Sequence, residues 1–254
     1  MCRLLCIATK GIIPHTAMSG FKRLARKGKN PPWSKSGPRS GWGIGYYPGG
    51  KLRLVHEFGD ATTSVRYDEV SHMASSNPDA RVLLGQMLCT PSRELLERRD
   101  KLAPFSGADT VGKQWLFAFD GRVGENRNTG EPFAPDPVKE MAFERIFREI
   151  LAGLRGGSSG QEEVRATIGR VLKATAADYR YDHLNLALTD GNTVYLARYV
   201  DAETDWNELN YCRTARAIIG CSEPLPTIEQ KWEKLGNRQL LHFDRELDFQ
   251  RTDL

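Results

Sequence analysis

Two helical patterns lie in the middle of the chain, between two groups of strand patterns. Residues 138–154 and 162–177 carry apolar residues every three or four positions, which is typical of amphipathic helices. Strands are predicted by short apolar or alternating runs at residues 2–9, 42–47, 51–56, 82–88, 115–119, 184–189, 193–199, 215–221 and 239–243. This order predicts an α+β fold in which two antiparallel sheets are flanked by helical layers.

Glycine, proline and asparagine mark the connections between these patterns. Pro48-Gly49-Gly50 and Asp190-Gly191-Asn192 each separate two strand patterns closely enough to predict a hairpin. Residues 155–160 are rich in glycine and serine, which predicts a flexible connector between the two helices. The chain has 254 residues, of which 40% are hydrophobic, and we expect a single domain over residues 1–254.

The first two residues, Met1 and Cys2, suggest a catalytic terminus. Residue 2 is small enough for the initiator methionine to be removed, which would leave a thiol beside its own α-amino group. A free α-amine titrates near ~8 and a cysteine near ~8.5, so the pair can act as base and nucleophile close to neutral pH. The alternative is that Cys2 is a buried cysteine of the first strand.

The other ionisable and metal-binding residue types show no grouping. The five cysteines and five histidines are scattered without paired spacing, so we expect neither a disulfide framework nor a metal site, and no cofactor. No apolar run approaches the ~18 residues that cross a bilayer. We therefore expect a cytoplasmic protein with reduced thiols and no membrane partner.

Basic residues are concentrated in the segment 22–40, which also contains several prolines and glycines. Nucleic-acid binding would require such a patch to occur with a recognisable motif or an aromatic platform, and Trp33 is the only aromatic residue there. We therefore expect no nucleic-acid partner. The segment is interpreted as a solvated loop, with a flap over an acidic ligand as the alternative.

Five motifs occur in an order that can be compared with a known family. They are Met-Cys-Arg-Leu-Leu at residues 1–5, Gly-Trp-Gly-Ile-Gly-Tyr-Tyr at 41–47, Pro-Phe at 104–105, Trp-Leu-Phe-Ala-Phe-Asp-Gly at 115–121 and Cys-Ser-Glu-Pro-Leu at 221–225. With these motifs the chain resembles the class II glutamine amidotransferases, and in particular the stand-alone bacterial branch that includes the γ-glutamyl hydrolase of ergothioneine synthesis. The resemblance implies an N-terminal-nucleophile (Ntn) hydrolase fold, an αββα four-layer sandwich, in which Cys2 attacks a γ-carboxamide.

The resemblance also identifies the group that would stabilise the tetrahedral oxyanion. In the family an Asn-Gly pair donates hydrogen bonds to it, whereas this chain has Asp120-Gly121. The Gly121 N–H can still donate, but an ionised Asp120 carries a negative charge and only acceptors. At ~4 Å and an effective dielectric constant of ~20, that repulsion is about 4 kcal/mol. Asp120 would support catalysis only in its protonated form.

The family's contacts to the amino-acid end of glutamine are also replaced. Leu88 lies at the position of the arginine that holds the α-carboxylate, and this removes a contact worth roughly 1.5–3 kcal/mol. Val138 lies at the position of an aspartate that holds the α-ammonium group, and Ser40 at that of an aspartate before Gly-Trp-Gly. Three basic residues that follow the Leu88 strand could reach the site or form an exposed basic run: Arg93, Arg98 and Arg99.

Other residues near these motifs allow structural roles. Trp42 is interpreted as a core residue, with a wall of the substrate pocket as the alternative. The glycines of residues 41–45 imitate a phosphate-binding loop but lack the lysine and helix that follow one, so we expect them to allow close packing of sheets. Arg3 is expected to pair with a carboxylate and tether the first strand, and Glu223 to anchor a loop.

Two functional hypotheses remain. The first is a Cys2-dependent amidohydrolase that acts on glutamine, a γ-glutamyl compound or another small-molecule amide, with ordinary glutamine hydrolysis impaired by a factor of ~10³. Any ammonia acceptor would then be a separate synthetase or acceptor protein. The second is a catalytically inactive member of the fold that binds or regulates a partner, because a fold does not determine a function.

Overall fold

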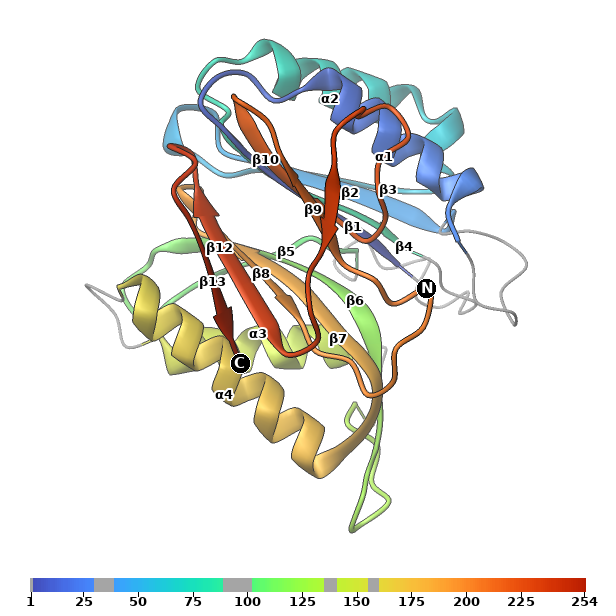
Figure 1. Cartoon of the computed structure of the whole chain (residues 1–254), viewed down its shortest axis with the longest axis vertical. Coiled ribbons are helices and arrows are strands. Elements are labelled where there is room, and N and C mark those ends of the chain that lie inside the picture. Colours follow the sequence, from blue (N-terminus) through green and yellow to red (C-terminus); the bar gives the residue numbers. More distant parts are fainter. Residues whose placement is uncertain (1, 30–38, 89–101, 135–140, 155–159) are drawn as a thin grey trace.

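The computed structural model describes residues 2–29, 39–88, 102–134, 141–154 and 160–254. Two helices, a first sheet, a second sheet and two further helices are stacked as four layers (Figure 1). The helices are α1 (His15–Lys27), α2 (Val65–Ser76), α3 (Ala142–Gly153) and α4 (Gln161–Asp178). The expected αββα architecture is confirmed.

The first sheet has seven strands in the order β11-β9-β10-β1-β4-β2-β3. Their bounds are β1 Arg3–Thr9, β2 Gly41–Tyr46, β3 Arg53–Phe58, β4 Val82–Leu88, β9 Asn210–Arg213, β10 Ala217–Cys221 and β11 Trp232–Lys234. Neighbouring strands in this sheet are antiparallel. Strand β1 is therefore enclosed on both sides, by β10 and by β4, and this fixes its register.

The second sheet has six strands in the order β13-β12-β8-β7-β6-β5, and these strands are also antiparallel to their neighbours. Their bounds are β5 Phe105–Ala108, β6 Gln114–Asn126, β7 Tyr179–Thr189, β8 Thr193–Arg198, β12 Gln239–Asp244 and β13 Phe249–Asp253. Two short 3-10 turns also lie within the described residues, η1 at Pro48–Gly50 and η2 at Ala61–Thr63.

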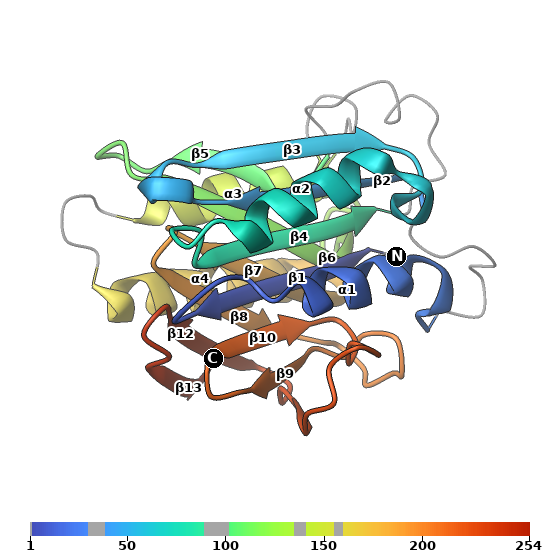
Figure 2. The ribbon, with the colours of Figure 1, turned by 90° about the horizontal axis from the view of Figure 1, so that it is seen from above.

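Alternation along the strands separates three cores. In β1, Leu4 and Cys6 face the second sheet, whereas Leu5 and Ile7 face the layer of α1 and α2. Viewed from above, these two helices lie over the first sheet (Figure 2). In β6, Leu116 and Ala118 belong to the layer between the two sheets. A residue's position in a strand therefore determines whether it faces the space between the two sheets.

The glycines of β2 allow the two sheets to approach, as expected from the sequence. A Cβ atom on Gly43 would lie 2.9 Å from Cδ of Pro104, and one on Gly45 would overlap the side chain of Leu116. Both residues face the second sheet, so larger side chains there would push the layers apart. The expectation of close sheet packing at these positions is confirmed.

Two helices were not expected from the sequence. Residues 22–27, which we assigned to a solvated basic loop, form the last two turns of α1, because Phe21 and Leu24 continue a buried apolar face while the lysines and arginines face outward. The N-cap of α2 is Ser64, whose hydroxyl accepts a hydrogen bond from the Tyr67 N–H at 3.0 Å. The expected helix at 138–154 begins at Ala142, and residues 135–140 lie outside the described residues.

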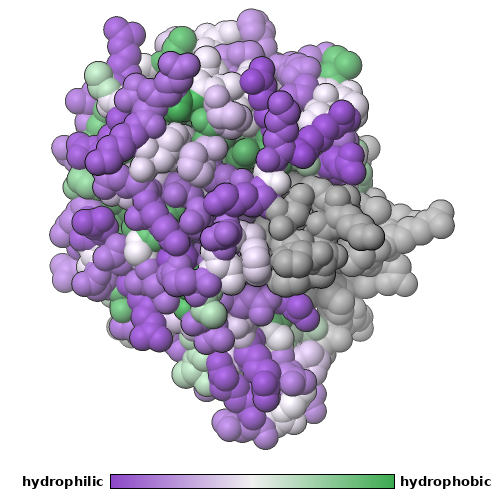
Figure 3. All heavy atoms as spheres, turned by 45° about the vertical axis from the view of Figure 1, so that its right-hand side comes forward, coloured by the Kyte–Doolittle hydropathy of each residue, from purple (hydrophilic) through white to green (hydrophobic). Residues whose placement is uncertain are grey.

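The outer surface of the sandwich is mainly polar. In Figure 3 the described part of one face is mostly hydrophilic, with isolated hydrophobic residues. Within the described ranges, no helix is both long and apolar enough to cross a membrane.

An arginine at the end of β8 provides a stability test. Arg198 is fully buried and donates two hydrogen bonds to Glu203, at 2.9 and 2.7 Å. These hydrogen bonds are the main reason why the pKa of Glu203 falls to about 2. The Glu203 side chain is itself half exposed, so solvent screening limits the energy of the pair.

We predict that this pair stabilises the fold above pH ~4.5 and that its contribution disappears as the pH falls from ~4.5 towards ~2, because the unfolded state takes up the proton first. After the discount for exposure, Glu203→Gln should lower the free energy of unfolding by roughly 1 kcal/mol at pH 7 and by much less near pH 2. Urea denaturation at both pH values measures the difference, with Glu229→Gln at an exposed site as the control. An equal loss at both pH values would contradict the assignment.

Candidate active site

Cys2 precedes the central strand β1 and lies at one end of the space between the sheets. It is 6% exposed and packs in an apolar cluster with Leu88 and Leu102, against which the partly buried Phe58 also packs. Leu88 ends strand β4, the neighbour of β1. With Met1 present in the chain, the surroundings of Cys2 are therefore those of a buried cysteine.

Asp120 lies on strand β6, in the second sheet, and is 1% exposed. The Ser222 hydroxyl donates a hydrogen bond to Asp120 Oδ2 at 3.3 Å and accepts one from the Leu4 N–H at 3.0 Å. The Ser222 N–H also donates to the Leu4 carbonyl at 3.1 Å. Asp120 is therefore connected through one side chain to β1, two residues after Cys2.

Gly121 follows Asp120 and pairs with Leu184 of β7. The carbonyl group of His183 leaves no room for a Cβ atom on Gly121, and such an atom would also lie 2.7 Å from Phe119. The register of β6 against β7 shifts between Gly121 and Val123, which is the irregularity of a β-bulge. Bulges are common next to active sites because they redirect backbone and side-chain groups.

Gln86 of β4 connects the sheets next to Asp120. Its side-chain amide donates to the Phe119 carbonyl at 2.8 Å and accepts from the Phe119 N–H at 2.9 Å. Gln86 is 1% exposed, and its amide continues the hydrogen bonding of β6 beyond the end of β5 at Phe105. The position of β6 across from β1 is therefore held by hydrogen bonds as well as by packing.

Arg3 anchors the backbone of the chain terminus, as expected from the sequence. Its Nε atom lies 2.6 Å from Glu223 Oε1, and the arginine is fully buried. The guanidinium also donates to the carbonyl groups of Cys2 and Lys29, while Glu223 accepts a hydrogen bond from the Lys29 N–H at 2.9 Å. The ion pair thus holds the backbone at Cys2, directly before β1, and at Lys29, shortly after the end of α1.

Of the other residues selected from the sequence, Ser40 and Trp42 are described in the structure. Ser40 donates its N–H to the Leu88 carbonyl at 2.9 Å and so lies beside Leu88. Trp42 is buried on the face that packs against α2, where its ring meets Tyr67 at 5.1 Å, and this is the position of a core residue. Four positions lie outside the described residues: Arg93, Arg98, Arg99 and Val138.

Sequence reasoning missed three polar side chains of this site, Gln86, His183 and Ser222. His183 Nε2 lies 3.6 Å from Asp120 Oδ1, and its side chain is 8% exposed. Gln86 is a single polar residue inside an apolar strand pattern, which could have identified it as functional or structural. No comparable pattern pointed to His183, because its contact with Asp120 forms between strands.

Buried thiols elsewhere in the chain are poor nucleophiles. Burial raises the pKa of the Cys212 and Cys221 thiols to about 12 and that of the Cys6 thiol still further. A thiolate is the reactive form of cysteine, so these three residues stay protonated at neutral pH. Cys89 lies outside the described residues.

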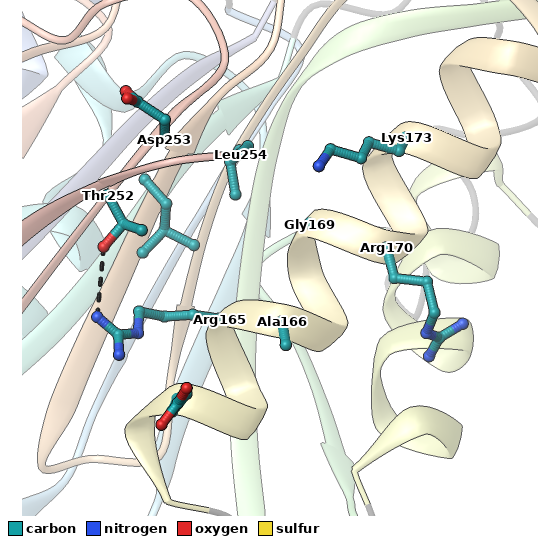
Figure 4. Close-up of a pocket in the computed structure, with 10 residues that line it drawn as sticks. Arg165, Ala166, Gly169, Arg170, Lys173, Thr252, Asp253 and Leu254 are labelled. Carbon is teal, nitrogen blue, oxygen red and sulfur yellow. Dashed lines mark hydrogen bonds between the residues drawn. The ribbon is translucent and has the colours of Figure 1, made fainter.

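A separate pocket of about 560 Å³ lies between α4 and strand β13 (Figure 4). Arg165, Arg170 and Lys173 of α4 line one side, and Arg165 donates to the Thr252 hydroxyl on the other. The residues that line it do not include any of those around Cys2 or Asp120. This pocket is therefore not part of the candidate site.

A model of the family "Glutamine amidotransferases class-II" matches residues 1–217, which is most of the chain. This chain belongs to the class II glutamine amidotransferase family. The matched range contains Cys2, Leu88 and Asp120-Gly121. A comparison with curated protein sequences gives no match.

Solved structures of similar fold include three amidotransferase proteins. The glutamine phosphoribosylpyrophosphate amidotransferase from B. subtilis, complexed with ADP and GMP, matches with a TM-score of 0.68 and 12% identity over 99% of this chain and 49% of its own. A glutamine aminotransferase class-II domain protein from Silicibacter pomeroyi matches with a TM-score of 0.58 and 15% identity, over 100% and 99% of the two chains. A glutamine amidotransferase from Pseudomonas aeruginosa, itself described as predicted, gives 0.56 and 14%, over 96% and 98%.

At these identities the structures show the fold alone. Two antiparallel sheets between helical layers are shared with them, and the Ntn-hydrolase architecture expected from the sequence is confirmed. The chain spans about half the length of the B. subtilis enzyme.

We predict that the Arg3–Glu223 pair is a major contributor to stability. Glu223→Gln removes the charge that compensates a fully buried arginine and should lower the free energy of unfolding by about 3 kcal/mol. The matched control is Glu246→Gln, which breaks the exposed Arg81–Glu246 pair and should change it by less than ~1 kcal/mol. Urea denaturation of both variants measures the difference, and similar losses would contradict the anchoring role.

Proposed function

We propose that the protein is a Cys2-dependent amidohydrolase that acts on glutamine, a γ-glutamyl compound or a related small-molecule amide. The observation that supports this most strongly is the Ser222 connection, which joins Asp120 and thus the Asp120-Gly121 pair to the start of β1 in a class II glutamine amidotransferase family member. Acyl transfer requires a nucleophile and an oxyanion donor close to the same carbonyl group.

The reaction begins with the terminus that remains after removal of Met1. The free α-amine of Cys2 accepts the thiol proton, and the thiolate attacks the amide carbon to form a tetrahedral oxyanion. The Gly121 N–H donates a hydrogen bond to that oxygen. The α-ammonium group returns the proton to the leaving nitrogen, the C–N bond breaks, and a thioester remains. Water, deprotonated by the same amine, then hydrolyses the thioester and releases the acid and the free thiol.

Among these substrates, we favour a small-molecule amide without the zwitterionic end that free glutamine and simple γ-glutamyl compounds share. Leu88 lies beside Cys2, where the family has an arginine, and Leu102 and Phe58 pack in the same cluster. An apolar wall cannot supply the charge-assisted contact that a carboxylate requires, which is worth roughly 1.5–3 kcal/mol. Together with the missing side-chain amide donor at position 120, this change supports a loss of ordinary glutamine hydrolysis by a factor of ~10³.

A second candidate is a catalytically inactive family member that keeps the fold for binding or regulating a partner. The burial of Cys2 among apolar side chains favours it, because a thiol that substrate cannot reach is structural. Removal of Met1 decides between the two candidates, since it changes both the charge and the space beside the thiol.

The setting of the proposed reaction follows from the same residues. We propose that the single domain works in the cytoplasm, a location supported by the free thiols of Cys6, Cys212 and Cys221. The ammonia is either released or taken up by a separate synthetase or acceptor protein. The complete activity of the longer B. subtilis relative is not assumed for this chain.

Labelling of the terminal thiol tests the proposal. We expect intact-mass analysis of natively expressed protein to show loss of Met1, and a chloromethyl ketone without a zwitterionic end to add one group at Cys2. Cys89→Ser supplies the background and Cys2→Ser the negative control, while Cys6, Cys212 and Cys221 stay unmodified because burial raises the pKa of each thiol. Retained Met1 and an unmodified Cys2 would instead favour the inactive candidate.

Restoring the family's polar residues tests the substrate assignment. Asp120→Asn combined with Leu88→Arg should raise glutamine hydrolysis by about 10²-fold or more, because it restores an oxyanion donor and a carboxylate contact. Asp120→Asn combined with Val65→Arg, at an exposed position, is the charge-matched control. A folded double variant with background glutaminase activity would show that these two positions are wrongly assigned.

A further inference from the structure

We infer that His183 is a positioning residue, whose ring holds the Asp120 carboxylate and compensates its charge beside the reacting atoms. The inference deepens the proposed function and rests on it for its catalytic meaning. It concerns a residue outside the Asp120-Gly121 pair. An asparagine at position 120, as in the family's Asn-Gly motif, would carry no charge to compensate.

The two side chains lie close together in a buried environment. His183 Nε2 is 3.6 Å from Asp120 Oδ1, and the two side chains are 8% and 1% exposed. A carboxylate with so little exposure needs hydrogen bonds or a nearby positive charge to offset the loss of hydration. Ser222 supplies one donor, to Oδ2. His183 is placed to supply a second, to Oδ1.

The ring of His183 has hydrogen-bonding capacity available for this role. Neither of its nitrogens has a hydrogen-bond partner among the described residues, although both are buried. Buried polar atoms in native proteins are normally satisfied, so an unsatisfied ring beside a carboxylate calls for an explanation. A contraction of less than ~1 Å would turn the present separation into a charge-assisted hydrogen bond of ~2.8 Å.

The backbone of His183 is fixed against the same two residues of β6. Asp120 pairs with Asn185 and Gly121 with Leu184, so His183 is the next residue along β7. Its carbonyl group occupies the space that a side chain on Gly121 would need. The geometry of Asp120-Gly121 therefore depends on His183 at two points, the ring and the carbonyl group.

The chemical consequence addresses the difficulty that Asp120 creates. An ionised carboxylate alone would oppose a developing oxyanion by about 4 kcal/mol at ~4 Å. With a proton on the neighbouring imidazole, the pair has no net charge, and the field at the oxyanion is that of a dipole. Asp120 and His183 together can then occupy the place of the family's asparagine without repelling the transition state.

His183 also lines a pocket of about 160 Å³, together with Asp182, Asp201 and Thr204. The Thr204 hydroxyl is a further buried group without a hydrogen-bond partner in the described part of the chain. The pocket offers a small molecule access to the position of the ring. Removal of the ring should therefore be open to chemical rescue.

The test measures coupling between the two residues in the full-length protein. His183→Leu should lower kcat for the amide substrate about tenfold or more with KM within about twofold, whereas in the Asp120→Asn background its effect should stay below about twofold. His183→Gln, which retains an N–H donor, should keep more activity than His183→Leu, and imidazole should partly restore His183→Gly. Equal losses in both backgrounds would overturn the inference, and thermal melts confirm that each variant folds.

A second readout does not require activity. In long-range ¹H–¹⁵N spectra of the histidine rings, Nε2 of His183 should carry a proton, and its resonance should shift in Asp120→Asn while that of His242 stays unchanged. If these signals couple but no variant hydrolyses any amide, the His183–Asp120 pair is supported and the proposed function fails. If the protein is active and the His183 resonance does not shift in Asp120→Asn, the inference fails and the proposed function stands.

Discussion

One hydroxyl group, that of Ser222, joins the two sheets at the candidate site. It accepts a hydrogen bond from the backbone of β1 and donates one to Asp120 on β6. Because a hydroxyl has a single proton, its use on Asp120 fixes the orientation of the group and leaves a lone pair for the Leu4 N–H. The relative position of the chain terminus and the Asp120-Gly121 pair depends on this bridge.

Other contacts keep that bridge in place. Gln86 forms hydrogen bonds with the backbone of Phe119, and the buried Arg3–Glu223 pair holds the backbone at Cys2 and Lys29. The glycines of β2 let the layers come close enough for these side chains to reach. These polar contacts lie near the apolar cluster in which Cys2 packs with Leu88. Under the proposed function, this arrangement would accept a substrate with an uncharged end.

Much of the fold could be predicted from local patterns, but α1 and α2 could not. The strand and helix periods of β1, β4 and α4 are strong enough to be read directly, whereas the many basic residues of α1 concealed its apolar face. At the site, Cys2, Asp120 and Gly121 were selected because they lie in ordered motifs. The partners of Asp120 were missed because His183 and Ser222 are distant from it in sequence, and only the pairing of strands brings them together.

The central claim is that the terminal sulfur and the Asp120-Gly121 pair face a common space between the sheets. The most direct test is a crystal structure of protein that lacks Met1 and has reacted with an amide-derived electrophile. The account predicts an adduct on the Cys2 sulfur, with its oxygen at the Gly121 N–H and its acyl chain against Leu88. An unreacted sulfur enclosed by Leu88, Leu102 and Phe58 would contradict it.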